Sequence, residues 1–487
     1  MEVNADNAPG QSLKQRTART LKWNTIDRVS QQVALAVIGV VLANLLSRED
    51  YGLTGVIAMF QAFAIVFVDS GFGAALLQKK ETDERDYSTV FWFNTAVAVG
   101  IYMLLWFAAP LIADFFRSER LVLLSRVMFL SFILNALGIV QTNRLMKQME
   151  VRQIALSNLA GLAVSGAVGI WLAVTGWGVW ALVWQTVSLA FVKTAWLWLA
   201  VRWRPVWVFS RESMRSIRRV GMGVFSSSLL NTFFLNLYTF VIGRWSLGML
   251  GVYTQADKWS KMGTASLSQI ITATFVPLLS RFQDNAAEFV RYMRRVDRFA
   301  ALTVVPLMAG LAMIATPLFH TLFGTKWDDA IPLFQILSLR GVFIIFISAY
   351  NNYLLAAGRA GSLVVVETVK DVAMLVALAV TIFIGTVEAL VWGQMVASAI
   401  TWVYVLLLTS RKTSCPVRYM LADMVPALAL SAVALAAGWG LSLVTEVAAV
   451  QLALRIAVAA VAYVALACAL RLPEVADARA YLLKRRK

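Results

Sequence analysis

Positive charge alternates with hydrophobic stretches along this chain, and this alternation constrains the fold more than any other feature of the sequence. Fourteen apolar stretches are long enough to cross a bilayer. The chain has 44 Lys and Arg residues, and 31 of them lie in the two terminal segments and in every second connection between the apolar stretches. The other connections hold only Arg48, Arg117, Arg120, Arg244 and Lys326. By the positive-inside rule the basic gaps are cytoplasmic. The sequence therefore predicts an even number of spans, with both termini in the cytoplasm.

Composition supports a membrane protein. Hydrophobic residues make up 60% of the 487 residues, and the mean hydropathy is +0.71. A soluble domain has an apolar share nearer one half. The net charge of +17 is spread over short loops on one membrane face, whereas a nucleic-acid-binding protein gathers its charge in a patch or groove. We therefore expect the lipid bilayer, and no nucleic acid, as the partner of this chain.

The predicted fold is an all-α integral membrane protein with about 14 transmembrane helices. Each predicted span is a run of roughly twenty apolar residues. The spans lie near residues 23–46, 51–78, 88–113, 121–143, 154–174, 176–200, 221–242, 250–279, 299–319, 330–355, 362–384, 387–409, 421–441 and 450–470.

The sequence contains signs of an internal repeat. The segment SREDYGLTGVIAMF, which begins at Ser47, resembles RWSLGMLGVYTQAD, which begins at Arg244, and the similarity pairs Gly52 with Gly251. Likewise, LIADFFRSERLVLLSRVMFLS resembles LFHTLFGTKWDDAIPLFQILS. In each pair, the two similar segments have the same position and direction within a block of six predicted spans. This arrangement predicts two pseudo-symmetric six-helix lobes related by an axis along the membrane normal, followed by two further helices.

These features predict six parts of the chain. They are a basic cytoplasmic N-terminus (1–22), an N-lobe with helices 1–6 (23–200), a cytoplasmic linker (201–220), a C-lobe with helices 7–12 (221–409), helices 13–14 (410–470) and a basic cytoplasmic tail (471–487). The charged segments 202–220 and 280–298 are expected to form amphipathic helices on the inner membrane surface. A ligand site is expected in a cavity between the lobes.

Ionisable residues inside the predicted spans are the first functional candidates, because an unpaired charge in a bilayer is costly. The bases outnumber the acids, and this imbalance favours an anionic ligand, above all a phosphate, whose oxygens accept hydrogen bonds from Arg and Lys. The bases are Arg28, Arg126, Lys193, Lys258, Lys261, Arg340, Lys370 and Arg455, and the acids are Asp27, Asp69, Asp257, Glu367 and Asp371.

Helical spacing groups some of these residues into stripes. One stripe lies on the first span and a second on the eighth, where Lys258 stands beside Lys261. Together with Arg340 and Lys370 they form the predicted substrate-binding set. Its members are Asn24, Asp27, Arg28, Gln31, Tyr253, Asp257, Lys258, Lys261, Arg340 and Lys370.

A structural alternative stays open for each of these charges. Asp257 and Lys261 have the i, i+4 spacing of an ion pair that only packs a helix. Three carboxyl groups, those of Asp69, Glu367 and Asp371, are candidates for coupling transport to H⁺ or Na⁺. The sequence predicts no catalytic residues, no metal site and no cofactor, and it lacks a Walker loop for ATP hydrolysis.

Several segments resemble bacterial polysaccharide-biosynthesis flippases of the Wzx type. These segments are YGLTGVIAMFQAFAIVFVDSGFGAALLQKK with the following STVFWFN, then VIGRWSLGMLGVYTQADKW, LFGTKWDDAIPLFQIL and NNYLLAAGR. Wzx flippases belong to the multidrug/oligosaccharidyl-lipid/polysaccharide exporter superfamily. The resemblance covers residues 15–475 and implies fourteen helices in two lobes around a central cavity.

The resemblance also implies a function. A flippase of this kind is not an enzyme and turns undecaprenyl-diphosphate-linked oligosaccharide from the inner to the outer leaflet of the bacterial inner membrane. In related lipid II flippases, basic residues on helices 1, 2 and 8 contact the diphosphate; by position, Arg28 matches the first role and Lys258 or Lys261 the third. Helix 2 carries Asp69 and no internal base, which departs from that pattern.

Two other functions stay open from the sequence. A multidrug extruder of the same superfamily would be expected to offer acids to cationic drugs, against the excess of bases found here. A membrane polysaccharide polymerase or ligase would need a roomy outer site, and the predicted outer loops are short. If the protein is a flippase, its partner proteins would be a polysaccharide polymerase and glycosyltransferases.

Overall fold

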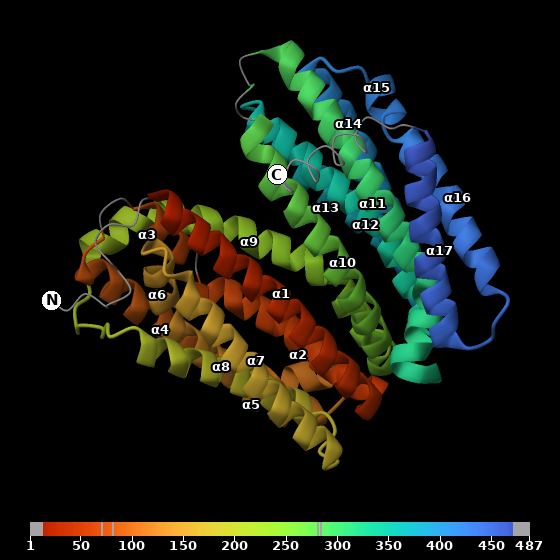
Figure 1. Cartoon of the computed structure of the whole chain (residues 1–487). Coiled ribbons are helices and arrows are strands. Elements are labelled where there is room, and N and C mark those ends of the chain that lie inside the picture. Colours follow the sequence, from red (N-terminus) through yellow and green to blue (C-terminus); the bar gives the residue numbers. More distant parts are fainter. Residues whose placement is uncertain (1–12, 70–71, 80–81, 280–281, 283–284, 471–487) are drawn as a thin grey trace. The chain divides into compact units, whose positions relative to one another are not determined.

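A computed structural model describes residues 13–69, 72–79, 82–279, 282 and 285–470, and within this part the chain is built from helices without strands (Figure 1). The chain divides into two compact units, Met1–Gly251 and Val252–Lys487. Each unit is described by itself below.

In the first unit α6 connects two sets of packed helices, because it packs on both α8 and α4. In one set α1 packs on α7 and α7 packs on α8, and in the other α9 packs on α2, α3 and α4. The helices are α1 (Leu13–Leu45), α2 (Arg48–Asp69), α3 (Phe72–Gln78), α4 (Glu84–Phe115), α5 (Arg120–Met128), α6 (Leu130–Lys147), α7 (Val151–Val174), α8 (Trp180–Ala200) and α9 (Arg211–Trp245), and α10 (Leu247–Leu279) begins here and continues into the second unit.

The second unit is organised around α11, which packs on α12, α16 and α17. α14 joins α12 to α13 by packing on both. The elements after α10 are α11 (Ala286–Phe323), a short 3₁₀ helix (Gly324–Trp327), α12 (Ala330–Ala356), α13 (Gly361–Thr381), a second 3₁₀ helix (Ile382–Ile384), α14 (Val387–Thr413), α15 (Val417–Ala422), α16 (Val425–Ser442) and α17 (Ala448–Ala469).

Twelve helical stretches of the described residues are long and apolar enough to cross a membrane, which shows a multi-pass membrane protein. Two predicted spans fall outside this set, although helices α10 and α13 occupy their positions. α13 holds three ionisable residues, Glu367, Lys370 and Asp371, within its 21 residues. The all-helical membrane fold is confirmed, and the total of fourteen spans stays a prediction.

The starts of α2 and α10 show the internal repeat at atomic detail. Ser47 precedes α2 and accepts a hydrogen bond from the Asp50 backbone N–H at 3.1 Å, and Ser246 precedes α10 and accepts one from Met249 at 3.3 Å. Serine is a favoured N-cap because its hydroxyl satisfies an otherwise unbonded helix N–H. Both helices therefore begin by the same local chemistry.

Reciprocal glycine contacts join these two helix starts. A Cβ on Gly52 would lie 1.8 Å from the carbonyl oxygen of Leu247, and a Cβ on Gly251 would lie 1.9 Å from that of Arg48. The two helix backbones touch where only a hydrogen atom fits. The pairing of Gly52 with Gly251 in the sequence thus corresponds to a contact in which each glycine meets the first turn of the other helix.

Of two predicted segments in the first unit, the structure corrects one. The predicted span 51–78 holds most of α2 and all of α3, and residues 70–71 between them lie outside the described residues. The predicted amphipathic helix 202–220 is helical only from Arg211, where α9 starts. The part before it is non-helical and is attached to α4, since the Val206 N–H donates to Ser88 Oγ at 3.1 Å and the Trp92 indole N–H donates to the Val206 carbonyl at 2.9 Å. These hydrogen bonds satisfy backbone N–H and C=O groups that would otherwise be paired within a helix.

The predicted linker 201–220 and the seventh predicted span both lie inside the first unit, which extends to Gly251. Aromatic packing explains why α9 belongs there. Phe225 stacks edge-on against Phe67 at 5.1 Å, and Phe240 stacks on Phe115 at 4.8 Å. The predicted N-terminus before residue 13 and the tail 471–487 lie outside the described residues.

Candidate functional site

Asp27 is the centre of a polar cluster in the first unit. Its side chain is only 9% exposed, and its carboxylate accepts hydrogen bonds from Gln31 at 2.7 Å and from Asn158 of α7 at 3.2 Å to each oxygen. Lys193 of α8 is close enough to interact electrostatically with the same carboxylate. The cluster thus joins α1, α7 and α8 through one buried acid.

The polar stripe of α1 does not act as a single surface. Asp27 is buried and Gln31 is half-buried, whereas Asn24 and Arg28 are exposed. Exposure of Arg28 suits a group that binds a ligand outside the helix bundle of its own unit. Its convergence with the bases of α10 on one cavity stays a prediction, because α10 after Gly251 belongs to the second unit.

Lys193 also lines a cavity of about 380 Å³ between α2, α6 and α8. The wall combines apolar side chains with the polar groups Asn135, Thr142, Asn143 and Thr194, and Lys193 is the one ionisable residue among the described lining residues. A small cavity with amide and hydroxyl groups and one base suits an anionic or hydroxylated ligand. The uncharged polar residues of α6 were not among the predicted site residues, because that prediction rested mainly on ionisable groups.

The stripe of α10 contains the predicted ion pair. Lys261 Nζ lies 2.6 Å from an Asp257 carboxylate oxygen, and the Lys261 side chain is 60% exposed. Lys258 lies over the ring of Trp259 at 5.7 Å. Asp257 therefore offsets one base of this helix, and the exposed lysine remains accessible to a second anion.

Tyr253 and Arg340 are brought together by a residue that the sequence did not point to. Arg340 donates to Gln394 Oε1 at 2.7 Å and to Ser398 Oγ at 2.9 Å, and Gln394 donates to the Tyr253 hydroxyl at 3.2 Å. Gln394 and Ser398 lie one turn apart on α14. This network links α10, α12 and α14, and its role is to orient the guanidinium of Arg340.

The three ionisable residues of α13 interact with one another. Lys370 forms an ion pair with Glu367 and lies 3.8 Å from Asp371. Glu367 is half-exposed, and Asp371 is mostly buried. Asp69 is the last residue of α2, but its side chain lies outside the described residues, so its coupling role stays a prediction.

Two intramembrane arginines have local structural partners. Arg126 lies 4.6 Å above the ring of Trp106 and donates to its carbonyl oxygen at 3.4 Å. Arg455 is 8% exposed and donates to Ser442 Oγ at 2.9 Å and to the Met313 carbonyl at 2.6 Å. These contacts satisfy both guanidinium groups inside the fold, which agrees with a packing role.

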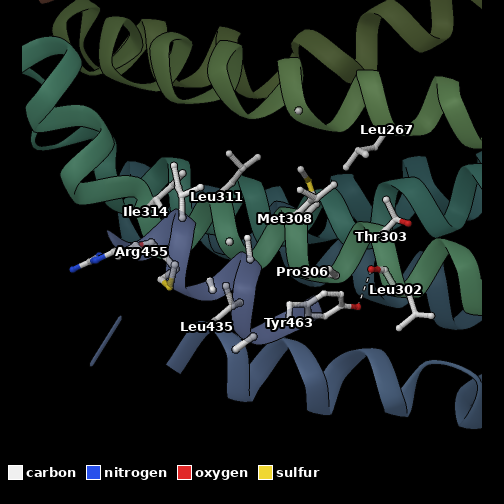
Figure 2. Close-up of a pocket in the computed structure, with 18 of the residues that line it drawn as sticks. Leu267, Leu302, Thr303, Pro306, Met308, Leu311, Ile314, Leu435, Arg455 and Tyr463 are labelled. Carbon is white, nitrogen blue, oxygen red and sulfur yellow. Dashed lines mark hydrogen bonds between the residues drawn. The ribbon is translucent and has the colours of Figure 1, made fainter. Parts of the chain in front are cut away.

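An apolar cavity of about 650 Å³ lies between α10, α11, α16 and α17 in the second unit. Figure 2 shows Leu302, Pro306 and Leu311 of α11 along it, with Tyr463 of α17 on the other side. The Tyr463 hydroxyl donates to the Leu302 carbonyl at 2.8 Å, and Arg455, whose nitrogens point away from the other labelled side chains, is the one charged residue of the described lining. The wall of the cavity is therefore mainly hydrocarbon.

Comparison with known proteins places the chain in a family. The sequence profile of the family described as "Polysaccharide biosynthesis protein" matches residues 41–332, which is more than half of the chain. The chain belongs to this polysaccharide biosynthesis family.

Individual members and folds agree with that assignment. Teichuronic acid biosynthesis protein TuaB of Bacillus subtilis is 25% identical to the present protein, and the similarity covers 70% of the present chain and 71% of TuaB. Lipopolysaccharide biosynthesis protein WzxC of Escherichia coli is 24% identical over 72% and 71% of the two chains. The predicted likeness to Wzx proteins is confirmed.

Two solved structures share the fold. The lipid II flippase MurJ, in an inward closed conformation, superposes with a TM-score of 0.73 at 14% identity and covers 93% of this polysaccharide biosynthesis protein and 100% of MurJ. An inward-facing multidrug resistance MATE family transporter of the MOP superfamily gives a TM-score of 0.59 at 17% identity, over 79% and 96% of the chains. These two neighbours are named as a flippase and a transporter, which agrees with the prediction that this protein is not an enzyme.

Proposed function

We propose that this protein is a flippase of the bacterial inner membrane that moves undecaprenyl-diphosphate-linked oligosaccharide from the inner to the outer leaflet for surface or exopolysaccharide biosynthesis. The cargo has a long hydrocarbon chain, an anionic diphosphate and a hydroxyl-rich glycan. Transport proceeds by alternating access and draws on an ion gradient.

The apolar cavity of the second unit is the observation that carries this proposal. Its volume of about 650 Å³ and its wall of Leu, Met, Ala, Ile and Val side chains suit a prenyl chain, which gains free energy for each methylene group withdrawn from water. A cationic drug would need an acid in this wall, and the described lining contains none. The cavity thus favours a lipid-linked cargo over the multidrug alternative.

Bases outside the apolar cavity provide for the diphosphate. Arg28 is exposed on α1, and Lys258, Lys261, Arg340 and Lys370 belong to the second unit. In the proposed cycle Arg28, Lys258 and Lys261 bind the diphosphate, because charge-assisted bonds from Arg and Lys to phosphate oxygens are stronger than neutral ones. A negative-inside potential assists outward movement by roughly 2.3 kcal/mol per charge per 100 mV. A polymerase and glycosyltransferases would use and supply the lipid-linked glycan.

Filling the apolar cavity tests the proposal directly. Ala460 lines the cavity and Ala457, one turn earlier on α17, is exposed and does not. We expect Ala460→Trp to lower the rate at which proteoliposomes flip a fluorescently labelled undecaprenyl-diphosphate disaccharide by about tenfold or more, which corresponds to about 1.4 kcal/mol of lost cargo binding. Ala457→Trp, the matched control, should flip at the wild-type rate. Equal flipping by both variants at equal protein levels would reject the cavity as the lipid site.

The diphosphate site has its own test. Cells that carry Arg28→Ala, Lys258→Ala and Lys261→Ala together should accumulate lipid-linked glycan on the inner leaflet, because the three removed bases supply the attraction for the anionic head. Arg126→Ala is the control for a base that has a packing role. Normal glycan export by the triple variant, at normal protein level, contradicts the proposed clamp.

A further inference from the structure

α11 carries a buried acid that the proposed cargo site does not use. Asp297 has no exposed surface and lies in the apolar core of the second unit, among Met293, Val296 and Ala300. Its Oδ1 accepts a hydrogen bond from the Tyr353 hydroxyl of α12 at 2.9 Å. Its Oδ2 has no hydrogen-bond partner within the described part of the chain.

Two further polar groups lie beside Asp297. The Tyr350 hydroxyl of α12 interacts electrostatically with Asp297 and has the indole N–H of Trp402 on α14 as its hydrogen-bonding neighbour. That contact falls short of good hydrogen-bond geometry, so the two groups are only weakly paired with each other. An unmet buried group costs about 1–3 kcal/mol. Native cores mostly avoid that cost, so the unpartnered Oδ2 of Asp297 beside this weak pair indicates a site with a function beyond packing.

The charges around this cluster leave Asp297 without an ionic partner of its own. Arg294, one turn earlier on α11, donates two hydrogen bonds to Asp423 at 2.7 and 2.9 Å, and Arg298 lies 3.5 Å from the same carboxylate. Burial raises the pKa of the Cys415 thiol, so this neighbour is uncharged at neutral pH. The remaining titratable neighbours are the phenols of Tyr350 and Tyr353.

An ionised Asp297 would be expensive in this environment. A buried carboxylate with one hydrogen bond and no bonded cation pays most of its desolvation cost without compensation. Adding a proton to Oδ2 removes the charge and turns this atom into an O–H donor. Protonation therefore removes the main cost of burying this side chain.

We propose that Asp297, with Tyr350 and Trp402, forms a proton-binding site inside the second unit, and that the proton it carries drives the transport cycle. In loading, one proton adds to Asp297 Oδ2 and no other bond forms or breaks, and in release the same proton returns to water. Asp423, held between two partly exposed arginines, is a charged group close enough to interact electrostatically with Asp297. Opening of the Arg294–Asp423 ion pair would give the proton access.

Coupling rests on the proposed flippase function, whereas proton binding does not, and the experiment separates the two. The first measurement is an infrared pH titration of the full-length protein in liposomes without cargo. The wild type should show a carboxylic acid C=O band that disappears as the pH rises, and Asp297→Asn should lack this band. Asp114→Asn, which removes an exposed acid of α4, should keep it. Asparagine preserves the acceptor for Tyr353, so the variant should fold.

The second measurement is flipping of the labelled undecaprenyl-diphosphate disaccharide with and without a pH gradient. We expect a gradient to accelerate flipping by the wild type and by Asp114→Asn several-fold, and to leave the flipping rate of Asp297→Asn unchanged. An unchanged infrared band in Asp297→Asn would overturn the proton site, and retained acceleration in this variant would overturn coupling. A wild type that titrates normally but flips no cargo would refute the flippase function while supporting the proton site.

Discussion

At the residue scale, most buried charges obtained a partner from a neighbouring helix rather than from their own stripe. Asp27 is held by Asn158 and Lys193 as well as by Gln31, and Arg340 is held by Gln394 and Ser398. Asp257 and Glu367 are exceptions, because their partners Lys261 and Lys370 lie one turn along the same helices. Local spacing therefore identified only the pairs that form within a helix.

Removal of the Asp27 carboxylate should destabilise the first unit. Asp27→Ala leaves two amide groups without their acceptor and removes the anion that interacts with the ammonium of Lys193, and we expect a loss of about 2–4 kcal/mol in the free energy of unfolding. The midpoint of thermal unfolding in detergent should fall accordingly. Asn24→Ala, on the same stripe but exposed, should change stability by less than about 0.5 kcal/mol. Similar midpoints for both variants would contradict the structural role assigned to Asp27.

At the element scale, local sequence explains where α2 and α10 begin, but it does not explain the conformation of the linker before α9. A serine cap begins both α2 and α10, and a glycine five residues later allows each helix to meet the other. The linker before α9 is non-helical, and its backbone N–H groups donate instead to the hydroxyl groups of Ser88 and Thr89 of α4. No pattern within the linker could predict those bonds, since the partners lie more than a hundred residues earlier.

Gly52 provides a test of the contact between the two helix starts. A methyl group at Gly52 would overlap the backbone oxygen of Leu247, so Gly52→Ala must separate the helices, and we expect a loss of about 1–3 kcal/mol. Gly100, in the middle of α4, has nothing within 4 Å of its added Cβ. Gly100→Ala should therefore be neutral or should stabilise by about 0.5–1 kcal/mol. Thermal unfolding compares the two, and equal effects would argue against the close contact.

At the scale of the whole molecule, topology rests on charge. The basic gaps predict a cytoplasmic loop before α15 and an outer loop between α16 and α17. In a variant without Cys415 and Cys468, a cysteine at exposed Glu446 should react with a membrane-impermeant maleimide in intact spheroplasts. A cysteine at exposed Arg411 should react only after lysis. The reverse labelling would invert the predicted orientation.

The sequence by itself determined the membrane class, the helical fold and the family resemblance, because hydropathy, loop charge and short packing motifs act over neighbouring residues. Only the tertiary structure decided which polar groups meet. Asn158, Gln394 and Asp297 gave no sequence signal of a site, since two are uncharged and the third lies in the charged segment 280–298, for which the sequence predicts an amphipathic helix on the membrane surface. Their importance comes from burial, and burial depends on helices far apart in the chain packing around them.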